Sequence, residues 1–295
     1  MKKILFYSNG KAVLPEIKAY QRYFTEYVCV DSRDVVQIDF NEYDLIWQFM
    51  GTGFKRIDRP TIHEFASASI GSLPKVKNFI KSKFSARPDL RIFLNHLVKK
   101  QFCFNDRIPY VYRDMGVDEI FFASKLVKEY DFLYIGDIVR ERNTHVLLNK
   151  FATEFKKYNI LLIGKCDGEL YKRYKNFNNM IFTGRIKQEE IPQLATKCVY
   201  AINYIPNIYP FNIQTSTKLL EYAAMDLKII TTDYWWVRNF ELENNMKFYK
   251  IDEDFSNFHY AELTNYKFKN NDMNKYLWKN VLDTSRIKDH IQKLI

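Results

Sequence analysis

The segment TSTKLLEYAAMDLKIITTD combines residue types that suit a ligand carrying both phosphate and hydroxyl groups. Its pattern predicts a short helix followed by a buried strand, and the helix start contains Thr215, Ser216, Thr217 and Lys218. Because a helix N-terminus carries free backbone N–H groups and partial positive charge, this start suits a phosphate. Glu221 lies one turn further, where its carboxylate can hold a sugar hydroxyl.

The segment TIHEFASAS provides a candidate for proton transfer. Its apolar start predicts a strand that delivers His63 and Glu64 into a loop of small residues. A histidine there can donate a proton to a leaving group or orient a reacting hydroxyl. The alternative is a strand-end histidine satisfied by neighbouring backbone groups, and His96 is the reserve candidate.

Two series of short apolar runs predict the strands that must position these residues. The first series covers residues 4–7, 27–30, 45–50, 61–65 and 109–112. The second, more regular series covers residues 132–135, 160–163, 180–182, 199–202, 228–231 and 246–249. Most runs leave room for one helix between them, which predicts an α/β fold with doubly wound parallel sheets and ligands at the carboxyl ends of the strands.

The length of 295 residues favours two domains, because it exceeds what one core usually supports. We expect Rossmann-like domains over residues 1–122 and 123–265, separated by the polar segment ASKLVKEYD. Residues 266–295 are expected to end in a helix over 273–294 that packs back on the N-terminal domain.

Composition excludes several classes of protein. The hydrophobic fraction of 47% and the charged fraction of 27% are typical of a globular protein, and no apolar run approaches the ~20 residues that span a bilayer. The first apolar run ends too soon for a signal peptide. Four scattered cysteines without a close pair indicate reduced thiols and a cytoplasmic location.

The formal net charge of +10 is concentrated between residues 75 and 100, where basic and apolar residues are interleaved. Such a stretch can be an ordinary solvated face over a core, contact anionic lipid, or bind nucleic acid. The solvated face is the commonest of these, and lipid ranks second. Because the sequence has no recognised nucleic-acid module, we expect no nucleic-acid partner.

Four segments of the second half resemble, in order, motifs of retaining glycosyltransferases with the two-Rossmann GT-B architecture, most closely glycosyltransferase family 4. They are YIGDIVRERN, LLIGKCDGEL, MIFTGRIKQEEIPQL and TSTKLLEYAAMDLKIITTD. RDMGVDEIFF, upstream, is similar to the segment that closes the family's first domain. Each motif alone is weak, whereas the ordered set over about residues 108–235 is fairly specific. The resemblance implies an acceptor-side first domain and a nucleotide-sugar-binding second domain that face each other across a cleft.

The resemblance also implies that cations, without a metal, hold the diphosphate of the donor. Arg142 occupies the position of a family lysine, whereas Asp137 stands where the family has an arginine, so Arg140 is the nearest substitute. Lys218 and the helix start beside it would make the second phosphate contact. Glu221 would hold the ribose hydroxyls, and His63 would lie against the donor sugar and diphosphate.

Other donor-binding candidates follow predicted strands. They are Asn9, Gly10, Gly164, Gly184 and Arg185. The nucleobase is expected near Gly184-Arg185-Ile186. One family glutamate falls on Ile213, which leaves the identity of the donor sugar open.

By resemblance, the chain transfers a hexosyl or N-acetylhexosaminyl group, with retention, from a nucleotide-diphosphate sugar such as a UDP- or GDP-sugar. The acceptor would be a glycan or lipid-linked molecule of bacterial cell-surface polysaccharide or lipopolysaccharide biosynthesis. We expect no cofactor and no metal, since DED at residues 252–254 is more typical of a solvated turn. Residues 75–100 would contact the inner face of the cytoplasmic membrane.

Three alternatives remain open at this point. One is a non-catalytic relative that binds sugar nucleotides or glycans, because one family carboxylate is lost. Another is a basic nucleic-acid-binding protein, which would explain the charge. A sugar-nucleotide epimerase ranks third among them.

Overall fold

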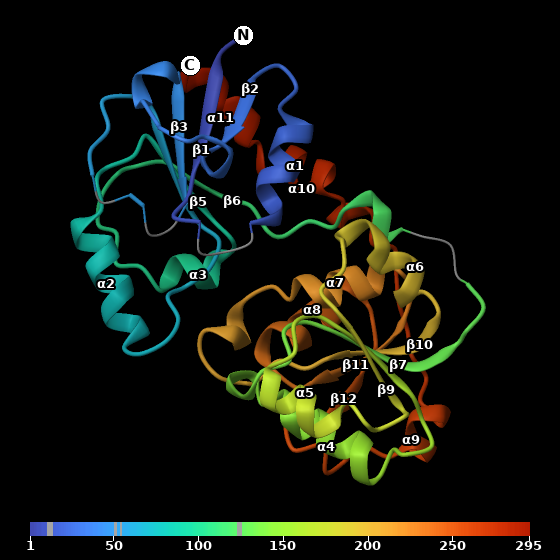
Figure 1. The fold of residues 1–295 in the computed structure, drawn as a ribbon. Helices are drawn as coiled ribbons and strands as arrows, with labels where there is room; N and C mark the ends of the chain where they lie inside the picture. Colours follow the sequence, from blue (N-terminus) through green and yellow to red (C-terminus); the bar gives the residue numbers. More distant parts are fainter. Residues whose placement is uncertain (11–13, 50–51, 54, 123–125) are drawn as a thin grey trace. The chain divides into compact units, whose positions relative to one another are not determined.

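The computed structural model describes residues 1–10, 14–49, 52–53, 55–122 and 126–295, which form two compact units (Figure 1). The first unit comprises Met1–Gly116, Ile213–Thr215 and Lys275–Ile295. The second comprises Val117–Asn212 and Ser216–Asn274. The boundary segment expected from the sequence includes residues 123–125, which lie outside the described residues, and the change of unit falls between Gly116 and Val117.

The first unit is built on a six-stranded parallel sheet with the order β2-β1-β3-β4-β5-β6. Its strands are β1 (Lys3–Tyr7), β2 (Val28–Asp31), β3 (Leu45–Phe49), β4 (Thr61–Phe65), β5 (Leu90–Phe93) and β6 (Tyr110–Tyr112). The five runs expected from the sequence correspond to five of these strands, although residue 50 lies outside the described residues. Because Arg91 interrupts its apolar pattern, the sequence did not predict β5.

Helices of the first unit come from both ends of the chain. They are α1 (Pro15–Tyr23), α2 (Pro74–Phe84), α3 (His96–Lys100), α10 (Trp278–Ser285) and α11 (Ile287–Leu294). The helix expected over residues 273–294 is therefore divided, and Arg286, in the left-handed conformation at φ 54°, separates α10 from α11. Near this point Tyr23 of α1 donates a hydrogen bond to Asp283 of α10.

The second unit has the strand order β12-β11-β10-β7-β8-β9, also entirely parallel. Its strands are β7 (Tyr130–Ile135), β8 (Ile160–Ile163), β9 (Met180–Gly184), β10 (Cys198–Asn203), β11 (Lys228–Thr232) and β12 (Tyr249–Ile251). Counted from β7, this is the 3-2-1-4-5-6 order of dinucleotide-binding folds, whose ligands bind where the order reverses. That point lies between β7 and β10.

The helices of the second unit connect these strands. They are α4 (Thr144–Thr153), α5 (Gly168–Tyr174), α6 (Ile191–Ala195), α7 (Thr217–Ala224), α8 (Trp235–Asn244) and α9 (Tyr260–Asn265). The core gathers around Phe132 of β7, whose ring stacks on Tyr200 of β10 at 5.4 Å. All four residues of β8 are buried, as expected for a parallel strand covered on both faces.

The sequence-based fold class, α/β with two doubly wound parallel sheets, is confirmed. The largest shift in a strand start is at β12, which begins at Tyr249 rather than residue 246, whereas β2 and β6 begin one residue later than expected. In the described part of the chain, no helix has both the length and the apolar character required to cross a bilayer.

Candidate functional site

Three glycines shape the carboxyl edge of the second sheet. Gly136 and Gly164 follow β7 and β8, and Gly184 ends β9. Gly164 has φ +146°, and a Cβ atom on it would lie 2.1 Å from the carbonyl oxygen of Gly136. Its N–H group donates to the carbonyl of Gly184 at 2.9 Å. The glycines therefore allow neighbouring strand ends to approach closely and keep side chains off this edge.

A cavity of about 540 Å³ opens beyond the ends of β8 and β9. Tyr171 of α5 and Phe182 of β9 form part of its wall, with their rings edge to face at 5.5 Å. Gly184 and Arg185 also line it, so the cavity includes the residues beside which the sequence placed a nucleobase. Aromatic walls joined to backbone polar groups suit a flat heterocycle.

The basic candidates near this edge differ in how they are held. Arg185 contacts both carboxylate oxygens of Asp137 at 3.2 Å, so Asp137 orients a cation rather than supplying one. Arg140 lies 3.8 Å from Glu169 in an exposed ion pair. Arg142 makes no ion pair with any residue that the structure describes.

Arg142 nevertheless lies close enough to influence Tyr134 at the end of β7. Burial raises the pKa of the Tyr134 hydroxyl to about 12, and the positive charge of Arg142 acts in the opposite direction. That hydroxyl is adjacent to Gly136, 3.1 Å from the position of a Cβ atom there. The guanidinium of Arg142 is thus an exposed cation near the end of the central strand, beside the point where the strand order reverses.

The start of α7 is fixed by a buried polar network. Ser216 accepts a hydrogen bond from the N–H of Leu219 and donates one to Asn203 at the end of β10. Asn203 in turn donates to Thr231 and Tyr234, which belong to β11 and the segment after it. This network holds the helix N-terminus at the carboxyl edge of the sheet, where its dipole favours an anion.

The three hydroxyl residues of the helix start therefore have different surroundings. Ser216 is engaged in capping, and Thr215, which belongs to the first unit, donates to Asp114 at 2.5 Å. The side chain of Thr217 and the backbone N–H groups of Thr217 and Lys218 have no partner among the described residues. These groups remain available to a phosphate.

Lys218 and Glu221 form one unit on the first turns of α7. Their Nζ and Oε2 atoms are 2.7 Å apart, and Glu221 is buried. Burial raises the pKa of Glu221, while the neighbouring ammonium of Lys218 opposes that shift. The pair brings one cation and one carboxylate together within one turn of the helix, a contact that the sequence analysis did not predict.

His63 lies inside the first unit on β4. Its side chain is 3% exposed, and one ring nitrogen bonds to the side-chain oxygen of Gln48 at 2.8 Å. Gly53 packs so closely on the imidazole that a Cβ atom there would lie 2.6 Å from it. Burial and the charge of Arg91 lower the pKa of His63 to about 4. His63 therefore lies within the strand rather than at its end, and a side chain rather than backbone satisfies it. The structure favours a structural role, and the catalytic role stays a prediction.

Glu64, the carboxylate next to His63 in that motif, belongs to a buried charge network. It accepts hydrogen bonds from Tyr20, Trp47 and Arg113, all on its side of the sheet. Arg113 also lies 3.7 Å from Glu16, and burial raises the pKa of Glu16. Sequence reasoning did not identify this network, because its members are far apart in the chain.

A second cavity, of about 450 Å³, lies at the carboxyl ends of β5 and β6. His96, Tyr112 and Asp114 line it together with Tyr276 and Ser285 from the C-terminal segment. His96, the reserve candidate, is thus an exposed residue beside a carboxylate-bearing pocket of the first unit. Asn9 and Gly10 are exposed after β1, where the order of the first sheet reverses.

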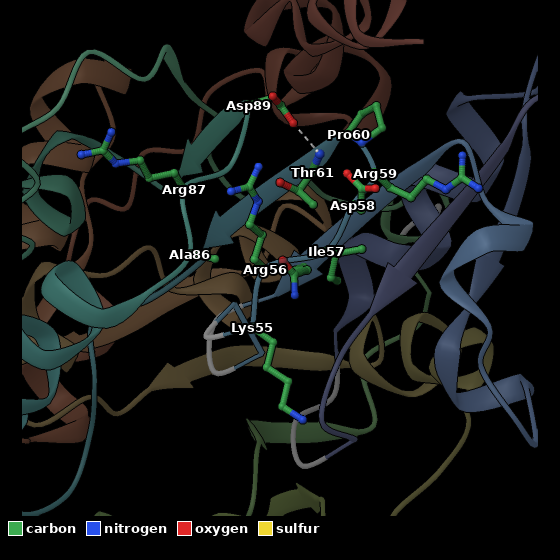
Figure 2. Close-up of a pocket in the computed structure, with 11 residues that line it drawn as sticks. Lys55, Arg56, Ile57, Asp58, Arg59, Pro60, Thr61, Ala86, Arg87 and Asp89 are labelled. Carbon is green, nitrogen blue, oxygen red and sulfur yellow. Dashed lines mark hydrogen bonds between the residues drawn. The ribbon is translucent and has the colours of Figure 1, made fainter.

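A basic hollow of about 310 Å³ lies at the amino ends of β4 and β5 (Figure 2). Figure 2 shows the guanidinium groups of Arg59 and Arg87 directed to opposite sides, with Lys55 directed away from both. Asp89 is engaged by the backbone N–H of Thr61 at 2.7 Å. Because the cations do not converge, this hollow does not form a built anion site.

The described residues contain no group of three or more histidine, cysteine, aspartate or glutamate side chains that could hold a metal ion. In the DED turn, Asp252 and Asp254 accept hydrogen bonds from Ser256. The hydrogen bond from the backbone N–H of Ser256 lowers the pKa of Asp254. Trp236 is buried and stacks on Phe240 at 4.9 Å, whereas Trp235 is partly exposed.

No protein-family model matches the sequence, and comparison with curated proteins gives no match. Solved structures do match. The chain is similar over the full length of both proteins to HepE from Anabaena in complex with UDP-glucose, with a TM-score of 0.68 at 12% identity.

Two further similar structures are glycosyltransferases by their names. AviGT4, involved in avilamycin A biosynthesis, has a TM-score of 0.62 at 10% identity over 99% of this chain and 97% of its own. A glycosyltransferase from Rickettsia africae has a TM-score of 0.57 at 12% identity over 99% and 98%. At such low identities the likeness shows the fold, which is that of GT-B glycosyltransferases.

Proposed function

We propose that the protein is a glycosyltransferase that takes a sugar from a nucleotide-diphosphate donor. The observation that carries this proposal is the arrangement at the carboxyl edge of the second sheet. A cavity with two aromatic residues in its wall, an exposed arginine and a helix start with a lysine–glutamate pair lie along neighbouring elements there. Structures of HepE contain UDP, UDP-glucose, or UDP and glucose, which supports a uridine diphosphate sugar as donor.

Each part of this edge has a role in the proposed reaction. The nucleobase occupies the cavity beside Phe182 and Arg185, and Glu221 accepts hydrogen bonds from the ribose hydroxyls. Arg142, Lys218 and the free N–H groups of α7 hold the diphosphate, whose negative charge grows as the bond to the sugar breaks. Cations that are already positioned stabilise that charge without a metal ion.

The proposed transfer retains the configuration of the sugar. In such a front-face displacement, the acceptor hydroxyl attacks on the side that the diphosphate leaves, and a phosphate oxygen of the donor receives the proton. This route needs no protein base, which agrees with the burial of His63. In the first unit, the pocket beside His96 and Asp114 offers hydrogen-bond partners to an acceptor hydroxyl.

The proposed acceptor is a glycan or lipid-linked molecule of bacterial surface polysaccharide or lipopolysaccharide biosynthesis, and the transferred group is a hexosyl or N-acetylhexosaminyl unit. The protein would act in the cytoplasm, at the inner face of the membrane. The basic character of residues 75–100 supports this location.

Calorimetric titration of the protein with UDP, GDP and CMP tests the donor site directly. We expect binding of one nucleoside diphosphate, with UDP first, and no binding of CMP. A sugar-release assay with the corresponding nucleotide sugars then reports turnover. Absence of binding by all of these nucleotides would refute the donor site.

A non-catalytic sugar-nucleotide-binding relative is the second candidate. Two observations favour it: Ile213 replaces a carboxylate, and Asp137, paired with Arg185, replaces a cation. Binding of UDP and UDP-sugars without release of UDP, in the presence of varied acceptors, is the result that this candidate predicts.

A further inference from the structure

Helix α2 has its polar side turned inward. Asn78 is buried, and its side-chain oxygen accepts a hydrogen bond from the N–H of Ser69 at 2.9 Å. The ammonium of Lys81 donates to the Ser69 hydroxyl at 2.9 Å, and burial lowers the pKa of Lys81. Ser82 accepts from the N–H of Cys103. Polar bonds, rather than apolar packing, therefore attach this helix to the first unit.

The outward side of α2 is apolar. Four of its side chains face solvent, with exposed fractions of 48%, 49%, 42% and 68% for Val76, Phe79, Ile80 and Phe84. Their spacing of three, four and eight residues places them along one side of a helix. Ile70 and Leu73, just before the helix, are also exposed, Leu73 by 70%. A surface helix normally shows the opposite pattern, with its apolar stripe toward the core.

Six large apolar side chains gathered within fifteen residues mark a binding surface, because hydrating them is costly unless a partner covers them. The helix lies at the periphery of the first unit (Figure 1). Its apolar side chains project from a single helix, which suits insertion into a soft medium.

The charge around this apolar surface is uniformly positive. Lys75, Lys77 and Lys83 are exposed on α2, and residues 65–88 contain no aspartate or glutamate. Long lysine side chains can lie along an apolar surface while their ammonium groups reach outward. An apolar face with a border of lysines is the pattern of helices that lie in the interface of an anionic bilayer.

We propose that α2 docks the protein on an anionic lipid bilayer, with Phe79, Ile80 and Phe84 inserted into the acyl boundary and the lysines at the headgroups. This inference rests on the proposed function for a lipid-linked acceptor. It assigns the membrane contact to residues 70–84 in place of the broader basic stretch at residues 75–100. Arg91 does not contribute, since it is buried and paired with Asp106.

Sedimentation of the full chain with vesicles tests the proposal. We expect binding to vesicles containing 30% phosphatidylglycerol, and at least about tenfold weaker binding to pure phosphatidylcholine. The double variant Phe79→Asp/Ile80→Asp should lose at least about tenfold in partition, because two charges must enter the acyl boundary. Leu242→Asp, which alters an exposed leucine of α8, is the matched control and should bind as the parent does.

Insertion has a separate readout. Vesicles made with brominated acyl chains should quench the tryptophan fluorescence of Phe79→Trp more than that of the parent protein. The fluorescence of Leu242→Trp should be quenched no more than that of the parent. If 0.5 M salt abolishes vesicle binding completely and Phe79→Trp shows no additional quenching, the insertion is refuted. Equal binding of the double variant and the parent would overturn the docking surface. Self-association that the double variant abolishes, without vesicle binding, would assign the surface to a second copy of this chain.

Titration of the double variant with UDP in solution separates this proposal from the proposed function. We expect unchanged UDP affinity, because α2 belongs to the first unit and the nucleotide edge to the second. A protein that binds vesicles but no nucleotide refutes the function alone. One that binds nucleotide but no vesicle refutes the docking alone.

Discussion

The Lys218–Glu221 pair gives the start of α7 a positive charge that is already oriented. Replacing Lys218 with glutamine removes a charge-assisted contact to the diphosphate, so we expect UDP binding to weaken by about 1.5–3 kcal/mol, or roughly 10- to 150-fold. Calorimetry measures this change. Lys228→Gln, at the amino end of β11, removes the same charge far along the strand from the site and should leave affinity unchanged.

A double-mutant cycle identifies what Lys218 does. Its removal also leaves Glu221 buried without its cation, which favours protonation of the carboxylate. If the only role of Lys218 is to keep Glu221 ionised, then Lys218→Gln should not change UDP affinity in a protein that already carries Glu221→Gln. A loss of affinity that persists in this background shows direct contact with the phosphate, and its disappearance contradicts our assignment.

His63 makes the stability of the first unit depend on pH. Its pKa of about 4 in the folded protein is below the unfolded value near 6.5, so below pH 6.5 the unfolded chain binds the proton first. The contribution of neutral His63 to the free energy of unfolding is therefore fully present above pH 6.5, and it is lost as the pH falls toward 4. From pH 7.5 to 5 the loss amounts to about 2 kcal/mol from this residue.

Urea unfolding of the parent and His63→Gln at the two pH values tests this assignment. The variant has no titrating imidazole, so its stability should fall by about 2 kcal/mol less than that of the parent over this interval. Equal pH dependence in the two proteins would show that His63 is accessible to protons when folded. Accessibility of this kind would restore it as a catalytic candidate.

At the scale of elements, glycines allow the ends of β7 and β8 to approach closely at the proposed donor site. Gly164→Ala would place a methyl group 2.1 Å from the carbonyl oxygen of Gly136, in a backbone conformation at φ +146° that disfavours side chains. We expect a loss of about 2 kcal/mol or more in the free energy of unfolding, measured by urea denaturation. Gly168→Ala, where no atom lies within 4 Å of the new methyl, should be neutral or stabilising. An equal loss in both variants would contradict the close approach of the two strand ends.

Continuous apolar runs made most strands predictable from sequence. The segment ILLI at residues 160–163 is buried on both faces. Its uninterrupted apolar sequence is typical of such a strand in a parallel sheet. The run at β5 was missed because Arg91 reads as a surface charge, although Asp106 and the ring of Phe104 hold it in the interior. No local pattern can reveal such a partner fifteen residues away. The sequence could not reveal the partners of Arg113 for the same reason, because Glu16 lies on α1 and Glu64 on β4.

The candidate site was predictable only where its residues share one segment. Thr217, Lys218 and Glu221 follow from helix periodicity and capping, and in the structure they share the first turns of α7. The pairing of Asp137 with Arg185 joins the ends of β7 and β9, so it depends on strand order. The pocket beside His96 depends on residues near the C-terminus that sequence reasoning could not place.

At the scale of the whole molecule, the chain crosses between two units, and the last segment completes the first one. Trp278 packs so tightly on Gly116 that a Cβ atom there would lie 2.5 Å from the indole, and it faces the buried guanidinium of Arg113. The nucleotide site that we propose, in contrast, lies in the second unit. A ligand stabilises only the unfolding unit that contains its site, unless the two units unfold together.

Differential scanning calorimetry can therefore show which thermal unfolding transition belongs to which unit. Trp278→Ala should lower the stability of the first unit by about 3–5 kcal/mol, through loss of a buried indole, and leave the transition of the second unit in place. Saturating UDP, at 100 times its dissociation constant, should raise the stability of the second unit by about 2.7 kcal/mol in both proteins. Trp236 is a buried tryptophan of α8 in the second unit. Trp236→Ala is therefore the reciprocal variant, and it should lower the midpoint temperature of the transition that UDP raises. If UDP instead raises the transition that Trp278→Ala lowers, either the nucleotide site includes the first unit or the two units unfold as one.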